Sequence, residues 1–137
     1  MGYPNPLIAV SDIDDLFTSL YKDLLQGRGY SVLSMPNRMR LLTWLGEIKP
    51  DLIITGGEGV QTGGLEFLRM IKSDPLISII PVVVVSKYPE LESRAIELGA
   101  FEFVPKPFKV QEFLALVSKG LERSEKEKFR AGGPPRH

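Results

Sequence analysis

The chain has 137 residues, 43% of them hydrophobic, and its 17 basic and 17 acidic side chains cancel to a formal net charge of zero. This length suits one compact domain. The chain has no cysteine, and its one histidine is His137. This composition excludes disulfides, thiol catalysis, histidine triads and metal sites built from clustered cysteine or histidine. The balanced charge gives no basic footprint for nucleic acid, so we expect protein partners.

The sequence offers no segment that is suited to a membrane. Its longest apolar stretch, 76–85, is interrupted by Ser78 and Pro81, and it is much shorter than the roughly 20 residues that a spanning helix needs. Residues 1–6 lack the basic start and apolar core of a secretory signal. We therefore expect a cytoplasmic protein without membrane contacts.

Short apolar runs alternate with segments of helical periodicity along the chain. The predicted strands are 7–10, 30–33, 52–55, 82–85 and 103–104. The predicted helices lie over the apolar residues of 17–25, 41–45, 65–71, 91–98 and 110–121. Gly46 and Pro50 are expected to close the second helix, and Gly99 the fourth.

This alternation predicts right-handed crossovers and a doubly wound parallel sheet of five strands in a three-layer α/β/α domain. Ligands of such sheets bind beyond the carboxyl ends of the strands. The segments that follow strands there are 11–14, 55–59, 86–88 and 105–107. We expect the domain to span 1–121, and the charged segment 122–137 to be a solvated tail or linker.

Four segments resemble the receiver domain of two-component response regulators, of the chemotaxis-regulator type. They are KPDLII at 49–54, GLEFLRMIKSDP at 64–75, IPVVVVS at 80–86 and ELGAFEFVPKPF at 97–108. The resemblance covers about 7–121 and implies a flavodoxin-like (βα)5 fold. It also implies phosphorelay chemistry, in which an aspartate after the third strand accepts phosphate from a histidine kinase. Two acids after the first strand hold Mg²⁺ in this family, and a hydroxyl, a lysine and an aromatic residue complete the site.

Three residues match the family's site one by one. Ser86 matches the hydroxyl residue, Lys106 the lysine and Phe103 the aromatic switch. The acceptor position, fixed by KPDLIIT before it and GGLEFL after it, falls on Gly56. Because glycine has no side chain to phosphorylate, the resemblance implies a degenerate receiver.

The acid pair is also incomplete. The phase of the first helix places Asp12 at the first acid position and Ile13 at the second, whereas a one-residue bulge would place Ser11 and Asp12 there. Either register leaves one carboxylate of the family's three.

Three other residues are candidate acceptors. Asp51 lies at the opposite end of its strand, roughly 16 Å away at about 3.3 Å per residue, and cannot substitute. Glu58 would need a two-residue slip, and it remains an alternative acceptor together with the hydroxyl of Thr55. A further alternative is an anion or nucleotide sensor at the loop Gly56–Gly59, although this loop lacks the Walker lysine and hydroxyl.

The charge of the pocket argues against a metal. In the family, carboxylates ~5 Å apart repel by about 3 kcal/mol at an effective dielectric of 20, and Mg²⁺ relieves that repulsion. Here Asp12 and Lys106 sum to zero, so we expect a direct or water-bridged contact between them and no cofactor. Weak Mg²⁺ binding by Asp12 and Glu58 is the alternative.

The matched residues also have structural interpretations. Ser86 would be a strand-end hydroxyl that bonds the backbone, and Phe103 a core aromatic. Lys106 lies in a PKPF segment that matches the family in full, and the Lys106–Pro107 peptide is predicted to be cis. The stretch 86–99 is about two residues shorter than is usual in the family, so the start of the fourth helix stays open.

These patterns predict a receiver-like module of a bacterial two-component system that interacts with proteins independently of phosphorylation and is not an enzyme. By the same resemblance, its expected interaction face is the fourth helix, fifth strand and fifth helix, which corresponds to the family's output and dimerisation face, and a homodimer through this face is possible. The residues predicted there are Leu91, Arg94, Phe101, Glu102, Val110 and Glu112. A phosphate-accepting regulator with a non-standard acceptor is the alternative function.

Overall fold

The computed structural model describes residues 5–57 and 63–130. Its strands are β1 (Leu7–Ser11), β2 (Ser31–Ser34), β3 (Leu52–Gly57), β4 (Val82–Ser86) and β5 (Glu102–Pro105). Its helices are α1 (Asp15–Gln26), α2 (Arg38–Ile48), α3 (Gly63–Ser73), α4 (Glu92–Glu97) and α5 (Val110–Arg130), and a 3₁₀ turn (Pro89–Leu91) precedes α4.

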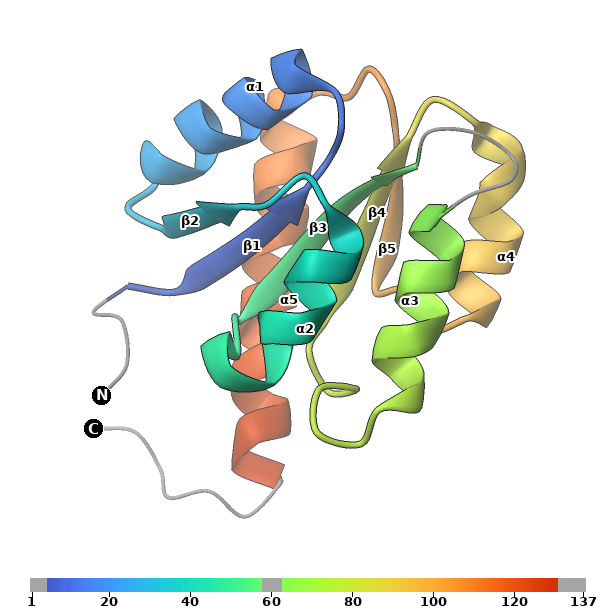
Figure 1. Ribbon diagram of the computed structural model, residues 1–137. Helices are drawn as coiled ribbons and strands as arrows, with labels where there is room; N and C mark the ends of the chain where they lie inside the picture. Colours follow the sequence, from blue (N-terminus) through green and yellow to red (C-terminus); the bar gives the residue numbers. More distant parts are fainter. Residues whose placement is uncertain (1–4, 58–62, 131–137) are drawn as a thin grey trace.

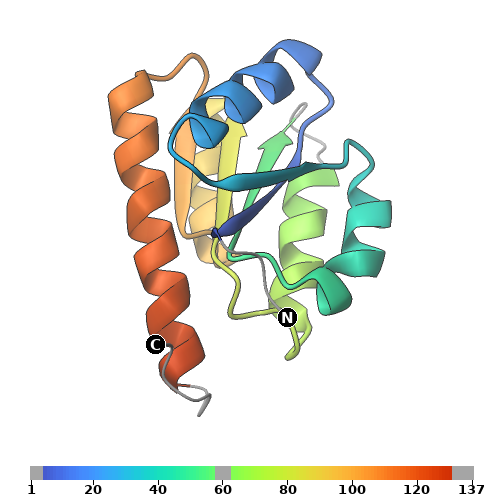
Figure 2. The same ribbon diagram turned by 90° about the vertical axis from the view of Figure 1, so that its left-hand side faces the viewer.

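The strands form one parallel sheet in the order β2-β1-β3-β4-β5. Helices α1 and α5 cover one face of the sheet, and α2, α3 and α4 cover the other (Figures 1 and 2). Every residue of β1 and β4 is buried, as continuous apolar runs predict for strands covered on both faces. The predicted doubly wound α/β fold is confirmed.

Two hydrophobic clusters hold the layers together, because successive strand residues point to opposite faces. Ile53 belongs to the cluster under α2, α3 and α4, and its neighbour Ile54 to the cluster under α1 and α5. The second cluster contains an aromatic stack in which the ring of Phe113 lies 4.5 Å from that of Phe108 and 5.7 Å from that of Tyr21. This stack ties α1 to the start of α5.

The end of α2 differs from the prediction. Gly46 lies inside the helix, which continues to Ile48 and is capped by Lys49 in the left-handed region, at φ 47°. Burial of Leu41 and Leu45 outweighs the cost of about 1 kcal/mol that an internal glycine imposes. Pro50 follows the cap, as predicted.

The fourth helix, whose start was left open, begins with the 3₁₀ turn at Pro89 and is short, at six α-helical residues. Its chain reverses at Gly99, which has φ +104°. Glycine adopts this conformation without the penalty that a Cβ atom brings. Gly99 therefore ends the helical segment as predicted.

Helix α5 runs without a break to Arg130, so residues 122–130 of the expected tail or linker are helical. Residues 122, 123, 125 and 126 are exposed. An i,i+4 pair between Arg123 and Glu127, at 3.6 Å, lies along this extension. Ser124 is buried, and Lys128 forms an ion pair with Asp51 at the start of β3. Within the described residues, no helix is both long and apolar enough to cross a membrane.

Close approach of α5 to the sheet depends on Gly120. A Cβ atom at this position would lie 2.6 Å from Cδ1 of Leu52, which is fully buried. We expect Gly120→Val to lower the free energy of unfolding by about 1–3 kcal/mol, as overpacking does. Ala115→Val, at an exposed position of the same helix, should cost only the propensity difference of about 0.5 kcal/mol. Urea denaturation of both variants checks this, and equal losses would contradict it.

Candidate functional site

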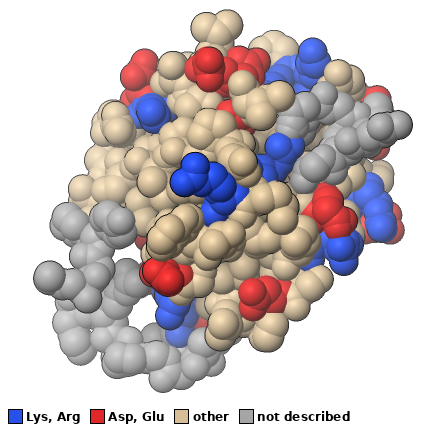
Figure 3. Space-filling model, in the orientation of Figure 1, with Lys and Arg blue, Asp and Glu red and all other residues tan. Residues whose placement is uncertain are grey.

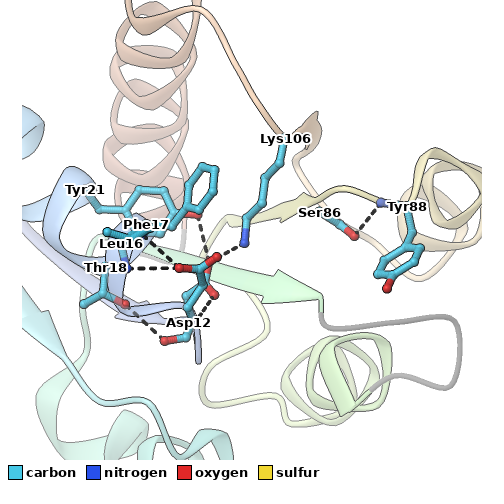
Figure 4. A network of polar contacts seen from close by, with 9 residues as sticks. Asp12, Leu16, Phe17, Thr18, Tyr21, Ser86, Tyr88 and Lys106 are labelled. Atoms are coloured by element: carbon cyan, nitrogen blue, oxygen red, sulfur yellow. Dashed lines mark hydrogen bonds and ion pairs between the residues drawn. The ribbon is translucent and has the colours of Figure 1, made fainter.

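The carboxyl ends of β1, β3 and β5 bring three sequence-predicted positions together. Asp12 follows β1, Gly56 lies near the end of β3, and Lys106 follows β5. The pairing register aligns Ser11 with Thr55, and Ser86 with both Gly57 and Pro105. Residues far apart in the sequence therefore meet at one edge of the sheet, where such folds bind their ligands (Figure 4).

The centre of the site is the carboxylate of Asp12, which is 3% exposed. Its Oδ2 accepts from Nζ of Lys106 at 2.9 Å and from the hydroxyl of Tyr21 at 3.0 Å (Figure 4). Its Oδ1 accepts from the backbone N–H of Asp14 at 2.9 Å. Both oxygens are thus occupied by donors. The predicted direct contact between Asp12 and Lys106 is confirmed.

Local structure holds this carboxylate in place. Asp14 caps α1 by accepting from the backbone N–H groups of Leu16 and Phe17, a typical role for aspartate at a helix start. Thr18 Oγ1 donates to the backbone carbonyl of Asp12 at 3.1 Å. The turn between β1 and α1 is therefore held by the bond from Asp14 to the Asp12 carboxylate, by the cap at Asp14 and by the bond from Thr18.

The side chain of Lys106 is also buried and contacts its neighbours on two sides. Its side chain is 10% exposed, and its Nζ lies 4.3 Å from the ring centroid of Phe17, within the range of a cation–π contact. The peptide between Lys106 and Pro107 is cis, as predicted.

Gly56 lies directly against the Asp12 carboxylate. A Cβ atom on Gly56 would overlap this group, and even the farther oxygen, Oδ1, would be 2.7 Å away. Real Cβ atoms do not approach other atoms so closely. The Asp12 carboxylate therefore fills the space that any side chain at position 56 would enter.

Neither register of the acid pair adds a second carboxylate near Lys106. Ser11 is the last residue of β1, and its hydroxyl donates to the carbonyl of Pro36 at 3.2 Å. Ile13 is 60% exposed. Among the residues that the structure describes, Asp12 is the carboxylate that contacts Lys106.

A second cation near Asp12 was not predicted. Arg38, at the start of α2, is half-buried; burial lowers the pKa of its guanidinium, and the negative charge of Asp12 partly opposes that shift. Among the described residues, Asp12 therefore acts electrostatically on Arg38 as well as pairing with Lys106.

Among the described residues, the oxygens of Asp12 are engaged by protein donors. In the described ranges 5–57 and 63–130, no group of three histidine, cysteine, aspartate or glutamate residues could hold a metal ion. The oxygens of Asp12 already accept from three donors, and Lys106 and Arg38 oppose a further positive charge. Glu58, the predicted weak second ligand, lies outside the described residues, as does Gly59 of the loop Gly56–Gly59.

The other matched residues lie apart from this network. The Oγ atom of Ser86 accepts from the backbone N–H of Tyr88 at 3.1 Å, away from the Asp12–Lys106 pair (Figure 4). Phe103 is buried in the cluster under α2, α3 and α4. Thr55 is fully buried, and its Oγ1 has no hydrogen-bond partner among the described residues. Asp51 accepts from the backbone N–H of Leu7 at 2.8 Å, at the opposite end of β3.

The predicted interaction face needs one correction. Leu91 is 4% exposed and belongs to the core, because the 3₁₀ turn before α4 points it toward the sheet. Arg94, Glu102, Val110 and Glu112 are exposed, and Phe101 is half-buried.

Sequence reasoning also missed Tyr21 as a site residue. It was assigned to the apolar face of α1 from its helical spacing, and its ring does pack in the core. Burial, together with the Asp12 carboxylate, raises the pKa of its phenol. A tyrosine, in place of a leucine, on a core-facing stripe is the one signal that could have suggested a buried polar partner.

Comparisons with known proteins agree with the fold and the sequence motifs. The sequence profile of the response regulator receiver domain matches residues 8–118. The polar-differentiation response regulator DivK of Brucella anthropi is 28% identical over 120 residues, which cover 86% of this chain and 97% of DivK. The DNA-binding transcriptional regulator NtrC of Salmonella typhimurium is 25% identical over 134 residues, which cover 93% of this chain and 28% of NtrC.

Solved structures show the same architecture. A CheY-like response regulator receiver domain protein from Methanospirillum hungatei superimposes with a TM-score of 0.79, covers 90% of this chain and 98% of its own, and is 21% identical. The chain belongs to the response regulator receiver domain family. Receiver domains are signalling modules of two-component systems that interact with partner proteins.

Burial of the Tyr21 phenol, together with the charge of Asp12 and the bond to it, makes stability depend on pH. Its phenol has a folded pKa above the unfolded value of about 10, so the protonated phenol stabilises the fold below that pH, and this contribution is lost as the pH rises further. We expect Tyr21→Phe to lower the free energy of unfolding by about 1.5–3 kcal/mol at neutral pH, because it removes a donor to a buried charge. The gap to wild type should narrow above pH ~10.

Denaturant titrations at neutral and alkaline pH measure this gap. Tyr30→Phe, which removes a half-buried phenol outside the Asp12 network, is the matched control. A gap that is absent at neutral pH, or that widens with pH, would show that Tyr21 does not support Asp12.

Proposed function

We propose that this receiver domain works as a protein-interaction module without phosphorylation. The observation that carries the proposal is the position of the Asp12 carboxylate, which fills the space above Gly56 and is bonded to Lys106. In the family, by the resemblance stated above, an aspartate side chain at position 56 would accept the phosphoryl group and the lysine would contact it. Here position 56 has no side chain, and Lys106 already has a carboxylate partner.

The burial of this pair supports a single resting state. The side chains of Lys106 and Asp12 are 10% and 2% exposed, and removing one partner of a buried pair typically costs about 3–5 kcal/mol. A phosphoryl group that entered the pocket would have to displace Asp12 from Lys106 and Tyr21. The pocket is therefore better suited to holding the loops after β1 and β5 together than to group transfer.

The alternative acceptors have less support. Thr55 is fully buried, so its hydroxyl is closed to a phosphodonor. Glu58 lies outside the described residues, and an experiment must decide its role.

Acetyl phosphate provides that test. After incubation with acetyl phosphate and Mg²⁺, the wild-type protein should show no phosphoryl adduct in its intact mass, whereas a receiver that carries the acceptor aspartate, run in parallel, should show one. An adduct on the wild-type chain would overturn the proposal. Its loss in Glu58→Gln or in Thr55→Val would then identify the acceptor and favour the alternative function.

We further propose that partner proteins bind the face formed by α4, β5 and α5. Its exposed residues include Arg94, Glu102, Val110 and Glu112. The similarity to DivK and NtrC suggests a bacterial two-component pathway for these partners. With the pocket closed, this face would keep one arrangement in the presence and absence of a phosphodonor.

Charge reversal on this face tests the proposal. Arg94→Glu and Glu112→Lys should each lower the recovery of native partners several-fold in quantitative pull-downs. Lys22→Glu, an equal charge change on the exposed side of α1, should not. Acetyl phosphate should leave wild-type recovery unchanged. Partner recovery that survives both face variants, or that changes with the phosphodonor, would contradict the assignment.

A further inference from the structure

The outward side of α2 has a composition that the isolated chain does not explain. Leu41 and Leu45 point into the core. The exposed residues of the helix are Met39, Arg40, Thr43, Trp44, Gly46 and Glu47. We call these six residues the α2 face. Met39 is 56% exposed and Trp44 is 44% exposed, and the surface of the molecule on the side of α2 and α3 is mostly uncharged (Figure 3).

Gly46 is the first anomaly. It lies in a helix interior, where glycine costs about 1 kcal/mol relative to alanine. A Cβ atom there would meet no described atom within 4 Å, and the residue has no positive φ that would require glycine. Neither packing against the described residues nor the backbone geometry therefore explains it. A glycine also allows another backbone to approach closely, which points to a partner outside the chain.

The stripe beside Gly46 suits a close helix contact. Met39, Thr43 and Gly46 follow one another at the i, i+4, i+7 spacing of one helix side. Thr43 Oγ1 donates to the carbonyl of Met39 at 3.0 Å, so the hydroxyl has its partner within the helix. The long apolar side chain of Met39 thus lies two turns from Gly46, where the helix has no side chain.

The charged residues of the α2 face in one copy of the chain are complementary to those in a second copy. Arg40 and Glu47 are exposed and lie seven residues apart, two turns along one side of the helix. Within 5–57 and 63–130, neither forms an ion pair. In an antiparallel pair of α2 helices related by a two-fold axis near Thr43, Arg40 of each copy faces Glu47 of the other. The same axis places Met39 of each copy over Gly46 of the other.

We propose that the α2 face is a homodimer interface, in which two copies of α2 pack antiparallel about a two-fold axis near Thr43. Such an interface is isologous, so each contact occurs twice. A helix of eleven residues spans only about 16 Å, and the dimer is accordingly weak and depends on concentration.

The alternative face of α4, β5 and α5 lacks these features. Two of its charges have local partners, Arg94 with Glu97 of the same helix at 3.8 Å and Glu112 with Lys109, which directly precedes α5, at 3.7 Å. Leu91, predicted to be its apolar contact, is buried. Dimerisation through α2 leaves that face open for the partner proteins proposed above, and it does not depend on whether the pocket accepts phosphate.

Sedimentation equilibrium of the full chain, from roughly 1 μM to 1 mM, tests the proposal over the range where weak dimers dissociate. The wild type should show a monomer–dimer equilibrium. Gly46→Gln should raise the dissociation constant at least about tenfold by filling the gap for Met39, while the monomer becomes more stable because the helix loses a glycine. This opposite movement separates an interface effect from a folding defect.

Charge reversal gives an independent measurement. Arg40→Glu should raise the dissociation constant about tenfold, because it places like charges opposite each other twice. The double variant Arg40→Glu/Glu47→Arg should restore it to within about threefold of wild type, because the swapped charges are again complementary. Val110→Glu, on the face of α4, β5 and α5, should leave it unchanged.

A wild type that stays monomeric over the whole range would overturn the proposal. It would also fall if Val110→Glu, and not Gly46→Gln, dissociated the dimer. If the double variant does not regain a dissociation constant near that of wild type, Arg40 does not face Glu47 of the other copy, and the antiparallel arrangement is wrong. All of these outcomes are independent of the acetyl phosphate experiment.

Discussion

The carboxylate of Asp12 receives the ammonium group of Lys106, the phenol of Tyr21 and a backbone N–H of the following turn, and it does so in the space above Gly56. A charged group out of water is stable only if it is paired and bonded. The strand β1, the first turn of α1 and the loop after β5 must therefore keep their relative positions. The absence of a side chain at position 56 makes this arrangement possible, since any Cβ atom there would displace the carboxylate.

The hydrophobic core supports this polar centre through aromatic rings. Tyr21 stacks against Phe113 and Phe108 while its hydroxyl bonds Asp12, and Phe17 contacts both Tyr21 and Lys106. One side chain thus belongs to the core and to the site at once. At the other end of the sheet, Asp51 bonds the start of β1 and pairs with Lys128 of α5. Different carboxylates thus hold the structure at the two ends of the strands: Asp12 at the carboxyl ends and Asp51 at the amino ends. Each of these carboxylates is paired with a basic side chain.

Much of the fold could be predicted because the apolar runs are short, regular and bounded by strong signals such as Pro50 and Gly99. The predictions failed where local and tertiary preferences conflict. Gly46 suggested a helix end, yet burial of Leu45 carries α2 past it. The charged segment after Glu122 suggested a tail or linker, and the structure shows it as a continuation of α5 to Arg130 that carries ion pairs of Arg123 with Glu127 and of Lys128 with Asp51. Leu91 was predicted on the interaction face, but it ends the 3₁₀ turn before α4 and is buried in the core.

The sequence by itself determined the alternation of strands and helices and the motifs that place the chain in its family, because each of these is local. By resemblance to the family, it also predicted that Gly56 stands at the position of the acceptor. It also predicted the pairing of Asp12 with Lys106, since the order of the strands brings their ends together. Only the tertiary structure decided that the carboxylate fills the space above Gly56, that Tyr21 bonds it and that Arg38 lies near it. These contacts join residues as far as 94 positions apart, and their geometry depends on how several loops converge, which no local pattern records.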